Sequence, residues 1–149
     1  MNLYNLDFPD DWSEAMAELR CYVTNHSPEN GGLGKHQHLK NAMMLLWPDL
    51  YGGEAAPGIP RWRDDLEMLT WAWCTHRVIS VIGHASAAKT HTFAHIIAAC
   101  YIADPRNSII TLTSTHLTGL RKRIWADTVS AIRLAHLGKS VHGGHLFDV

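Results

Sequence analysis

The sequence predicts an α/β fold in which short parallel strands alternate with helices. Residues 78–82 (VISVI) and 108–113 (SIITLT) are short, rich in β-branched residues and typical of buried strands. Apolar residues at helical spacing follow each of them, over residues 90–103 and from Leu117 to near Gly138. Strand, helix, strand and helix with short connections predict parallel pairing through a right-handed crossover.

A helical arm is expected before these elements. Residues 11–23 predict a short helix, because Asp11 can cap it and Glu14 stands three residues later. Residues 35–47 predict a second helix, since its apolar residues fall on one face and Pro48 would end it.

A predicted linker or surface loop separates the arm from the α/β elements. Residues 49–60 contain YGGEAAPGIP and show no periodicity, which predicts an internal linker or a long surface loop. From Arg61 onward, apolar residues again repeat at helical spacing and predict a third helix. We therefore expect an N-terminal arm and linker over residues 1–60, and the first part of the α/β domain over residues 61–149.

The composition excludes several classes of protein. The 149 residues, 46% of them hydrophobic, are enough for a domain with a core, and 13 Lys and Arg nearly balance 14 Asp and Glu. The longest apolar run is much shorter than the roughly 20 residues needed to cross a bilayer. The acidic N-terminus does not resemble a signal peptide, and the three cysteines show no CxxC spacing. We expect a soluble, cytoplasmic protein with no membrane partner.

The residues that carry chemistry lie between the first predicted strand and its helix. They are Gly83, His84, Ala85, Ser86, Ala87, Ala88, Lys89 and Thr90. This segment matches the phosphate-binding pattern G-x-x-x-x-G-K-[ST] except that Ala88 replaces the second glycine. Lys89 is then expected to act as the catalytic residue by holding the β- and γ-phosphates of ATP, and the Thr90 hydroxyl to bind Mg²⁺. Alternatively, Gly83 merely ends a strand and Lys89 merely begins a helix.

Ala88 is the position at which the loop departs from its pattern. A glycine lets the backbone approach phosphate closely, whereas a methyl group crowds that approach. We expect Ala88→Gly to strengthen nucleotide binding and to lower slightly the stability of the empty protein.

Three stretches together resemble the N-terminal ATPase region of phage and prophage terminase large subunits. They are GGLGKHQHLKNAMMLLWPD, GHASAAKTH and DPRNSIITLTSTHLTGLRKRIW, within roughly residues 31–135. The resemblance implies a helicase-like P-loop NTPase core whose Walker A loop is residues 83–90. It also implies that Thr113, Ser114 and Thr115 couple the nucleotide state to DNA. The loop departs from the family in two ways. Ala87-Ala88 stands where the family usually has Ser-Gly, and the loop lacks the arginine that many packaging ATPases place inside it.

The resemblance further implies a motor that hydrolyses ATP to pump double-stranded DNA into a capsid in the host cytoplasm. Its partners would be the portal protein, the small terminase subunit and further copies of itself. Hydrolysis also needs an acidic strand end for Mg²⁺ and a carboxylate that orients water. The sequence shows neither, because Asp148 follows only two apolar residues. We expect an incomplete domain that is not catalytic alone; another helicase-like ATPase or a truncated non-catalytic P-loop module remain alternatives.

Two weaker signals have simpler explanations. His91 and His95 stand four apart on a predicted helix and could share a metal, or His91 could face solvent while His95 packs at a polar edge. Residues 121–123 (RKR) could touch DNA phosphates or a neighbouring subunit, or could form a solvated helix face.

Overall fold

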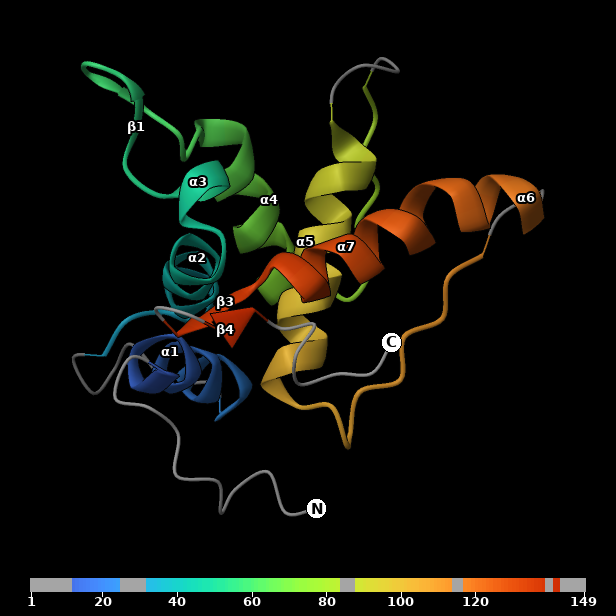
Figure 1. Ribbon diagram of the computed structural model, residues 1–149, viewed down its shortest axis with the longest axis horizontal. Coiled ribbons are helices and arrows are strands. Elements are labelled where there is room, and N and C mark those ends of the chain that lie inside the picture. Colours follow the sequence, from blue (N-terminus) through green and yellow to red (C-terminus); the bar gives the residue numbers. More distant parts are fainter. Residues whose placement is uncertain (1–11, 25–31, 84–87, 114–116, 139–140, 143–149) are drawn as a thin grey trace.

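The structure is a computed structural model that describes residues 12–24, 32–83, 88–113, 117–138 and 141–142, and it is mostly helical (Figure 1). The helices are α1 (Trp12–Thr24), α2 (Lys35–Leu46), α3 (Pro48–Tyr51), α4 (Asp64–Thr75), α5 (Lys89–Ala103), α6 (Leu117–Leu120), the π-helix η3 (Arg121–Trp125) and α7 (Ala126–Leu134). The strands are β1 (Glu54–Ala56), β2 (Ile59–Pro60), β3 (His136–Gly138) and β4 (Val141–His142).

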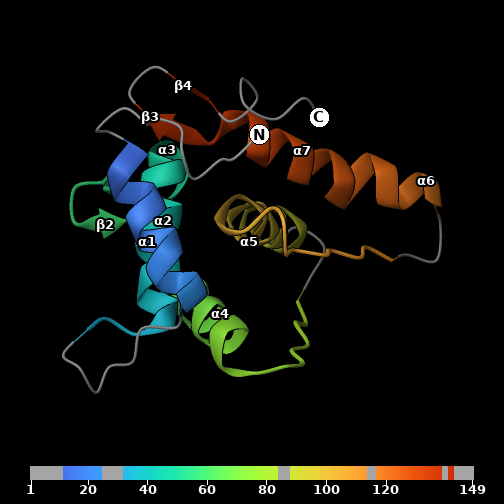
Figure 2. The same ribbon diagram turned by 90° about the horizontal axis from the view of Figure 1, so that it is seen from below.

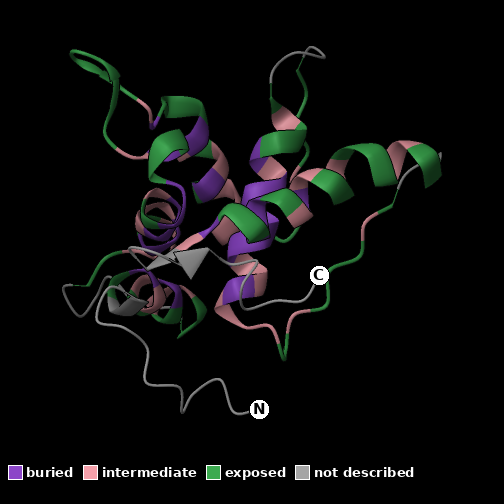
Figure 3. Cartoon of the chain, in the orientation of Figure 1, coloured by how far each residue is buried: buried purple, intermediate pink, exposed green. Residues whose placement is uncertain are grey.

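Helix α5 forms the centre of the core. Figure 2 views α5 almost end-on, with α7 on one flank and α1, α2 and α4 on another. Its sequence, KTHTFAHIIAACYIA, is apolar or small on most sides, so residues 94–99 in the middle of the helix are all buried (Figure 3). Residues from α1, α2, α4, α5 and α7 join one hydrophobic cluster around it.

The two helices predicted for the arm are confirmed as α1 and α2. Leu19 of α1 and Leu39 of α2 are fully buried, and these two helices share the largest contact between elements. The Glu18 carboxylate lies 2.6 Å from Nδ1 of His38, which ties the helices together at their polar side. Pro48 ends α2, as predicted, and also opens α3, because proline is well tolerated at the first helical position.

The segment predicted as a linker has structure of its own. Residues 48–51 form α3, and β1 and β2 pair as a short antiparallel hairpin. The hairpin is exposed to solvent (Figure 3). Its turn contains Gly58 at φ 75°, a backbone conformation that glycine adopts without strain. Its base is closed by Arg61, whose Nη1 donates a 2.8 Å hydrogen bond to the carbonyl of Gly52.

The predicted α/β fold with a parallel sheet is wrong for the part of the chain that the structure describes. The strands there are two separate antiparallel hairpins, β1–β2 and β3–β4. Residues 78–83 and 108–113 form no strand, and no backbone hydrogen bond joins them. Their side chains were expected to be buried, yet Val78, Ile82 and Ile109 are 87%, 95% and 94% exposed.

The reason for this error is that a strand requires a partner backbone. A β-branched run favours an extended conformation locally, but pairing depends on which other segment lies beside it. Residues 78–83 precede α5 and residues 108–113 follow it, at its opposite end (Figure 1). The helices α5 and α7 pack against each other and against the arm instead of against a sheet.

The last predicted helix is interrupted and shorter than expected. The helical region from Leu117 passes through the π-helix η3 and ends at Leu134, not near Gly138. Gly138 instead lies in β3, which pairs with β4. Short π-helical turns of this kind occur often at functional sites.

Candidate functional site

The two ends of the predicted phosphate loop lie close together. Helix α5 begins at Lys89, and the Nζ of Lys89 donates a 2.7 Å hydrogen bond to the carbonyl oxygen of Gly83. The lysine side chain thus reaches the residue that opens the motif. His84, Ala85, Ser86 and Ala87 lie outside the described residues.

The start of α5 is electrostatically suited to an anion. The helix has 15 residues, and its N-cap residue Ala88 provides no side-chain hydrogen bond to the first turn. The amide groups of the first turn have no partner within a helix, and the helix dipole places partial positive charge there. With the ammonium group of Lys89, these amides form a positive site at the end of the loop.

Ala88 has an unusual backbone conformation. Its φ of 52° and ψ of 19° place it in the left-handed region, and it is the one non-glycine residue with positive φ among those described. An L-residue pays roughly 1–2 kcal/mol for this conformation, whereas glycine does not. The backbone at the second glycine of the pattern therefore still has the conformation that favours glycine. This reverses the sign we expected for the effect of Ala88→Gly on the stability of the empty protein.

A cavity of about 520 Å³ adjoins the loop. It lies between α4, residues 78–83 and α5, and both Gly83 and Lys89 line it. Most of the other lining side chains are apolar, such as Leu69 and Phe93. Its size falls within the range of small-molecule sites, about 300–1,000 Å³.

The one carboxylate that lines this cavity is already paired. Asp65 accepts two hydrogen bonds from the Arg63 guanidinium, at 2.9 and 2.7 Å. The hydrogen bond from Arg63 holds the pKa of the Asp65 carboxyl below its ordinary value. Asp65 is thus an engaged carboxylate and not a free general base.

Thr90, the predicted Mg²⁺ ligand, is exposed at the first turn of α5. Within the described ranges, no group of three or more His, Cys, Asp or Glu residues could hold a metal ion. Thr90 can supply one oxygen ligand, so phosphate oxygens and water would have to complete an octahedral Mg²⁺ shell.

The histidine pair of α5 is divided between solvent and core. His91 is exposed, as one alternative predicted. His95 is buried, with its ring edge-to-face against Trp47 at 4.7 Å and Tyr51 at 5.5 Å, and not at a polar edge. Its Nδ1 donates a 2.8 Å hydrogen bond to the His91 carbonyl, and burial lowers the pKa of His95 to about 4. His95 is therefore a neutral core residue.

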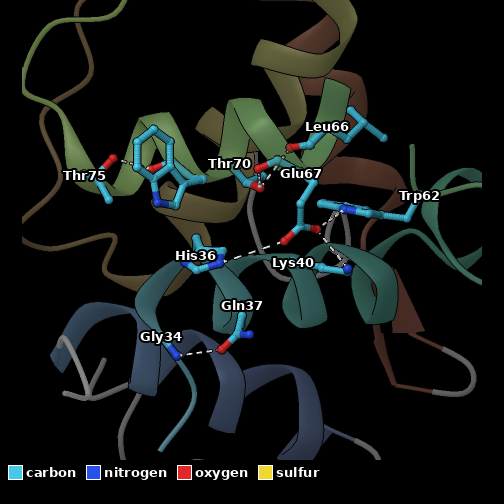
Figure 4. Close-up of polar contacts among 10 residues, drawn as sticks. Gly34, His36, Gln37, Lys40, Trp62, Leu66, Glu67, Thr70 and Thr75 are labelled. Atoms are coloured by element: carbon cyan, nitrogen blue, oxygen red, sulfur yellow. Dashed lines mark hydrogen bonds and ion pairs between the residues drawn. The ribbon is translucent and has the colours of Figure 1, made fainter. Parts of the chain in front are cut away.

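A polar cluster on Glu67, which the sequence did not reveal, connects α2 to α4 (Figure 4). The carboxylate accepts hydrogen bonds from Lys40 Nζ at 2.9 Å and Trp62 Nε1 at 2.7 Å. His36 lies 3.9 Å from its other oxygen. The hydrogen bond from Lys40 lowers the pKa of the Glu67 carboxyl. Since Glu67 is fully engaged with groups that hold the fold together, its role is structural.

The remaining predicted residues that the structure describes do not line the cavity beside the loop. Residues 121–123 are exposed on η3. Thr113 is exposed at the end of residues 108–113, and Ser114 and Thr115 lie outside the described residues.

No family model, curated protein or solved structure matches this chain. Among the helices in the described ranges, none is long and apolar enough to span a membrane.

Proposed function

We propose that residues 83–90 bind the phosphate groups of ATP, and that the chain is the nucleotide-binding part of a DNA-packaging ATPase of the terminase large-subunit type. The observation that carries this proposal is the 2.7 Å contact between Lys89 Nζ and the Gly83 carbonyl at the start of α5. It brings the charged residue of the motif to the glycine that opens it. The phosphate-binding part of the proposal rests on this contact and on the start of α5, and the terminase part rests on the sequence resemblance.

Phosphate binding at this loop follows from the charges and donors present. A phosphate oxygen would replace the Gly83 carbonyl as the acceptor of the Lys89 ammonium, and charge-assisted hydrogen bonds are stronger than those to neutral acceptors. Amides at the start of α5 would donate to the same phosphate. With ATP, the Thr90 hydroxyl would contribute one ligand to the Mg²⁺ that accompanies the nucleotide.

Hydrolysis and DNA translocation are proposed for the larger assembly. There ATP hydrolysis would drive double-stranded DNA into a capsid, with the portal protein, the small subunit and further copies of the motor as partners. The described residues that line the cavity include no free carboxylate to orient water, since Asp65 is held by Arg63. The chain by itself is therefore expected to bind nucleotide without turning it over.

A non-catalytic nucleotide-binding module is the second candidate. The observation that favours it is the methyl group of Ala88 at a backbone position where the phosphate must approach closely. Such a module would bind nucleotide weakly and would have no turnover in any assembly.

Calorimetric titration with Mg·ATP tests the binding proposal. The wild-type protein should bind with a Kd in the high micromolar range, and Lys89→Ala should weaken binding at least about tenfold. Lys122→Ala, which removes an exposed lysine of η3, is the matched control and should bind as the wild type does. Equal heats from wild type and Lys89→Ala would contradict the proposal. Steady, Lys89-dependent phosphate release would instead contradict the expected lack of turnover and the second candidate.

A further inference from the structure

A second cavity lies between residues 110–112 and the helical segment α6–η3. Its volume is about 420 Å³, and it is lined by Ile110, Leu112, Leu117, Leu120, Arg121 and Trp125. We call this cavity the η3 groove. Leu117 and Trp125 are 62% and 52% exposed, so the groove lies at the surface with large apolar side chains open to solvent. Exposed apolar surface next to a cavity is typical of interaction sites.

One wall of the η3 groove has the geometry of a strand edge. Ile110 and Leu112 line it while Ile109 and Thr111 do not, which is the two-residue alternation of extended backbone. The backbone of residues 109–113 makes no hydrogen bond to the backbone of any other described residue. Its N–H and C=O groups can therefore pair with an incoming strand.

The other wall carries one positive charge, because Arg121 lines the groove while Lys122 and Arg123 do not. Arg121, Lys122 and Arg123 are exposed, and none of them forms an ion pair with a residue in the described ranges. The helical residues 117–125 include no acidic residue. An occupant of the groove thus meets aliphatic side chains at its floor and the guanidinium of Arg121 at its rim, which no described carboxylate pairs.

We propose that the η3 groove binds an extended polypeptide segment of a partner protein in which apolar and acidic side chains alternate. The segment adds a strand to residues 109–113 by main-chain hydrogen bonds, a recognised mode of peptide binding. Its apolar side chains fill the floor between Leu112 and Leu120, and a carboxylate pairs with Arg121. A nucleic acid fits less well, because the floor is aliphatic and Trp125 is the one ring on which a base could stack.

Fluorescence anisotropy with defined probes tests this proposal. The probe is a fluorescein-labelled peptide of alternating valine and glutamate. The comparison probes are the valine–lysine peptide, the valine–glutamate peptide with N-methylated backbone amides, and a labelled DNA duplex. We expect the valine–glutamate peptide to bind in the micromolar range, and the three comparison probes to bind at least about tenfold more weakly.

Variants of the protein test separately how the charge and the apolar floor of the groove contribute to peptide binding. Arg121→Glu should weaken binding of the valine–glutamate peptide at least about tenfold and improve binding of the valine–lysine peptide. Leu117→Ser should weaken binding of both peptides, since it removes apolar floor. Arg20→Glu, an exposed charge reversal on α1, should change neither. All three positions are exposed, so circular dichroism should show unaltered helix content.

Several results would overturn the proposal. If the valine–lysine peptide bound the wild type as tightly as the valine–glutamate peptide, the proposed preference for acidic side chains would be wrong. If the N-methylated peptide bound as tightly, the proposed main-chain pairing with residues 109–113 would be wrong. Tighter, Arg121-dependent binding of the DNA duplex would make the groove a nucleic-acid surface. No binding of the valine–glutamate peptide would refute the site itself.

Discussion

The indole Nε1 of Trp47 donates a 2.9 Å hydrogen bond to the carbonyl oxygen of Ala131, and both residues are buried. This bond joins the end of α2 to α7 across 84 positions of sequence. The same indole packs edge-to-face against His95 of α5. Trp47 thus connects three helices of the core.

We expect Trp47→Phe to lower the free energy of unfolding by about 1–3 kcal/mol, because the Ala131 carbonyl would stay buried without its donor. Urea unfolding followed by circular dichroism measures this change. Trp71→Phe is the matched control, since Trp71 is exposed, and should change stability by less than about 0.5 kcal/mol. Similar losses in both variants would contradict the role of the hydrogen bond.

Ala88→Gly should raise both nucleotide affinity and stability. The loss of the methyl group should strengthen Mg·ATP binding by about 1–2 kcal/mol, or roughly tenfold. Relief of the left-handed strain at φ 52° should outweigh the greater entropy of the unfolded chain, for a net gain of about 0.5–1 kcal/mol.

Titration calorimetry and thermal unfolding without ligand measure these two effects separately. Ala98→Gly is the control, because it makes the same substitution at a buried position inside α5. Glycine has a lower helix propensity than alanine, so Ala98→Gly should destabilise the protein. If Ala88→Gly lowered the melting temperature as Ala98→Gly does, the left-handed conformation of Ala88 would be refuted. An unchanged affinity would mean that the loop is adapted to alanine.

His95 should make stability fall as the pH falls below its ordinary pKa. Its pKa is lowered from 6.5 to about 4, chiefly by burial. Between about pH 4 and 6.5 the unfolded chain therefore binds more protons than the folded chain. The free energy of unfolding consequently rises with pH across this range, and it falls as the pH drops below 6.5. The shift corresponds to at most about 3 kcal/mol.

Urea unfolding at a series of pH values tests this dependence. His95→Phe keeps an aromatic ring against Trp47 and Tyr51 and should flatten the profile between about pH 6.5 and 4. His91→Ala, which changes the exposed member of the pair, should leave the slope in place. A His95→Phe profile as steep as that of the wild type would show that other groups cause the dependence.

Glu67→Ala should destabilise the protein by about 1–2 kcal/mol, because Trp62 Nε1 and Lys40 Nζ would lose their acceptor. Glu67→Gln keeps one acceptor oxygen and should cost less. Chemical denaturation of both variants measures the difference, with Glu14→Ala, an exposed carboxylate of α1, as the control. A Glu67→Ala effect no larger than that of Glu14→Ala would show that the cluster contributes nothing to stability.

The sequence predicted the helices well because their signals are local. Apolar periodicity and end signals lie within a few residues of each other, and α2 and α5 begin and end within one residue of the predicted positions. Gly83 and Lys89 belong to one short motif, but the hydrogen bond between them became visible only in the structure.

The sheet was not predictable in the same way. The β-branched composition of residues 78–82 does not determine which backbone pairs with them, and no described residue forms a backbone hydrogen bond with them. The burial of those residues, inferred from composition alone, was therefore also wrong.

By itself, the sequence determined where the helices of this protein form and which short loop carries the phosphate-binding pattern, because neighbours along the chain decide both. Only the tertiary structure decided that His95 is a core residue and that Glu67 accepts hydrogen bonds from Lys40 and Trp62. It also decided that two β-branched segments stay exposed. Burial and pairing depend on contacts between residues far apart in sequence, and these form only when the whole chain packs.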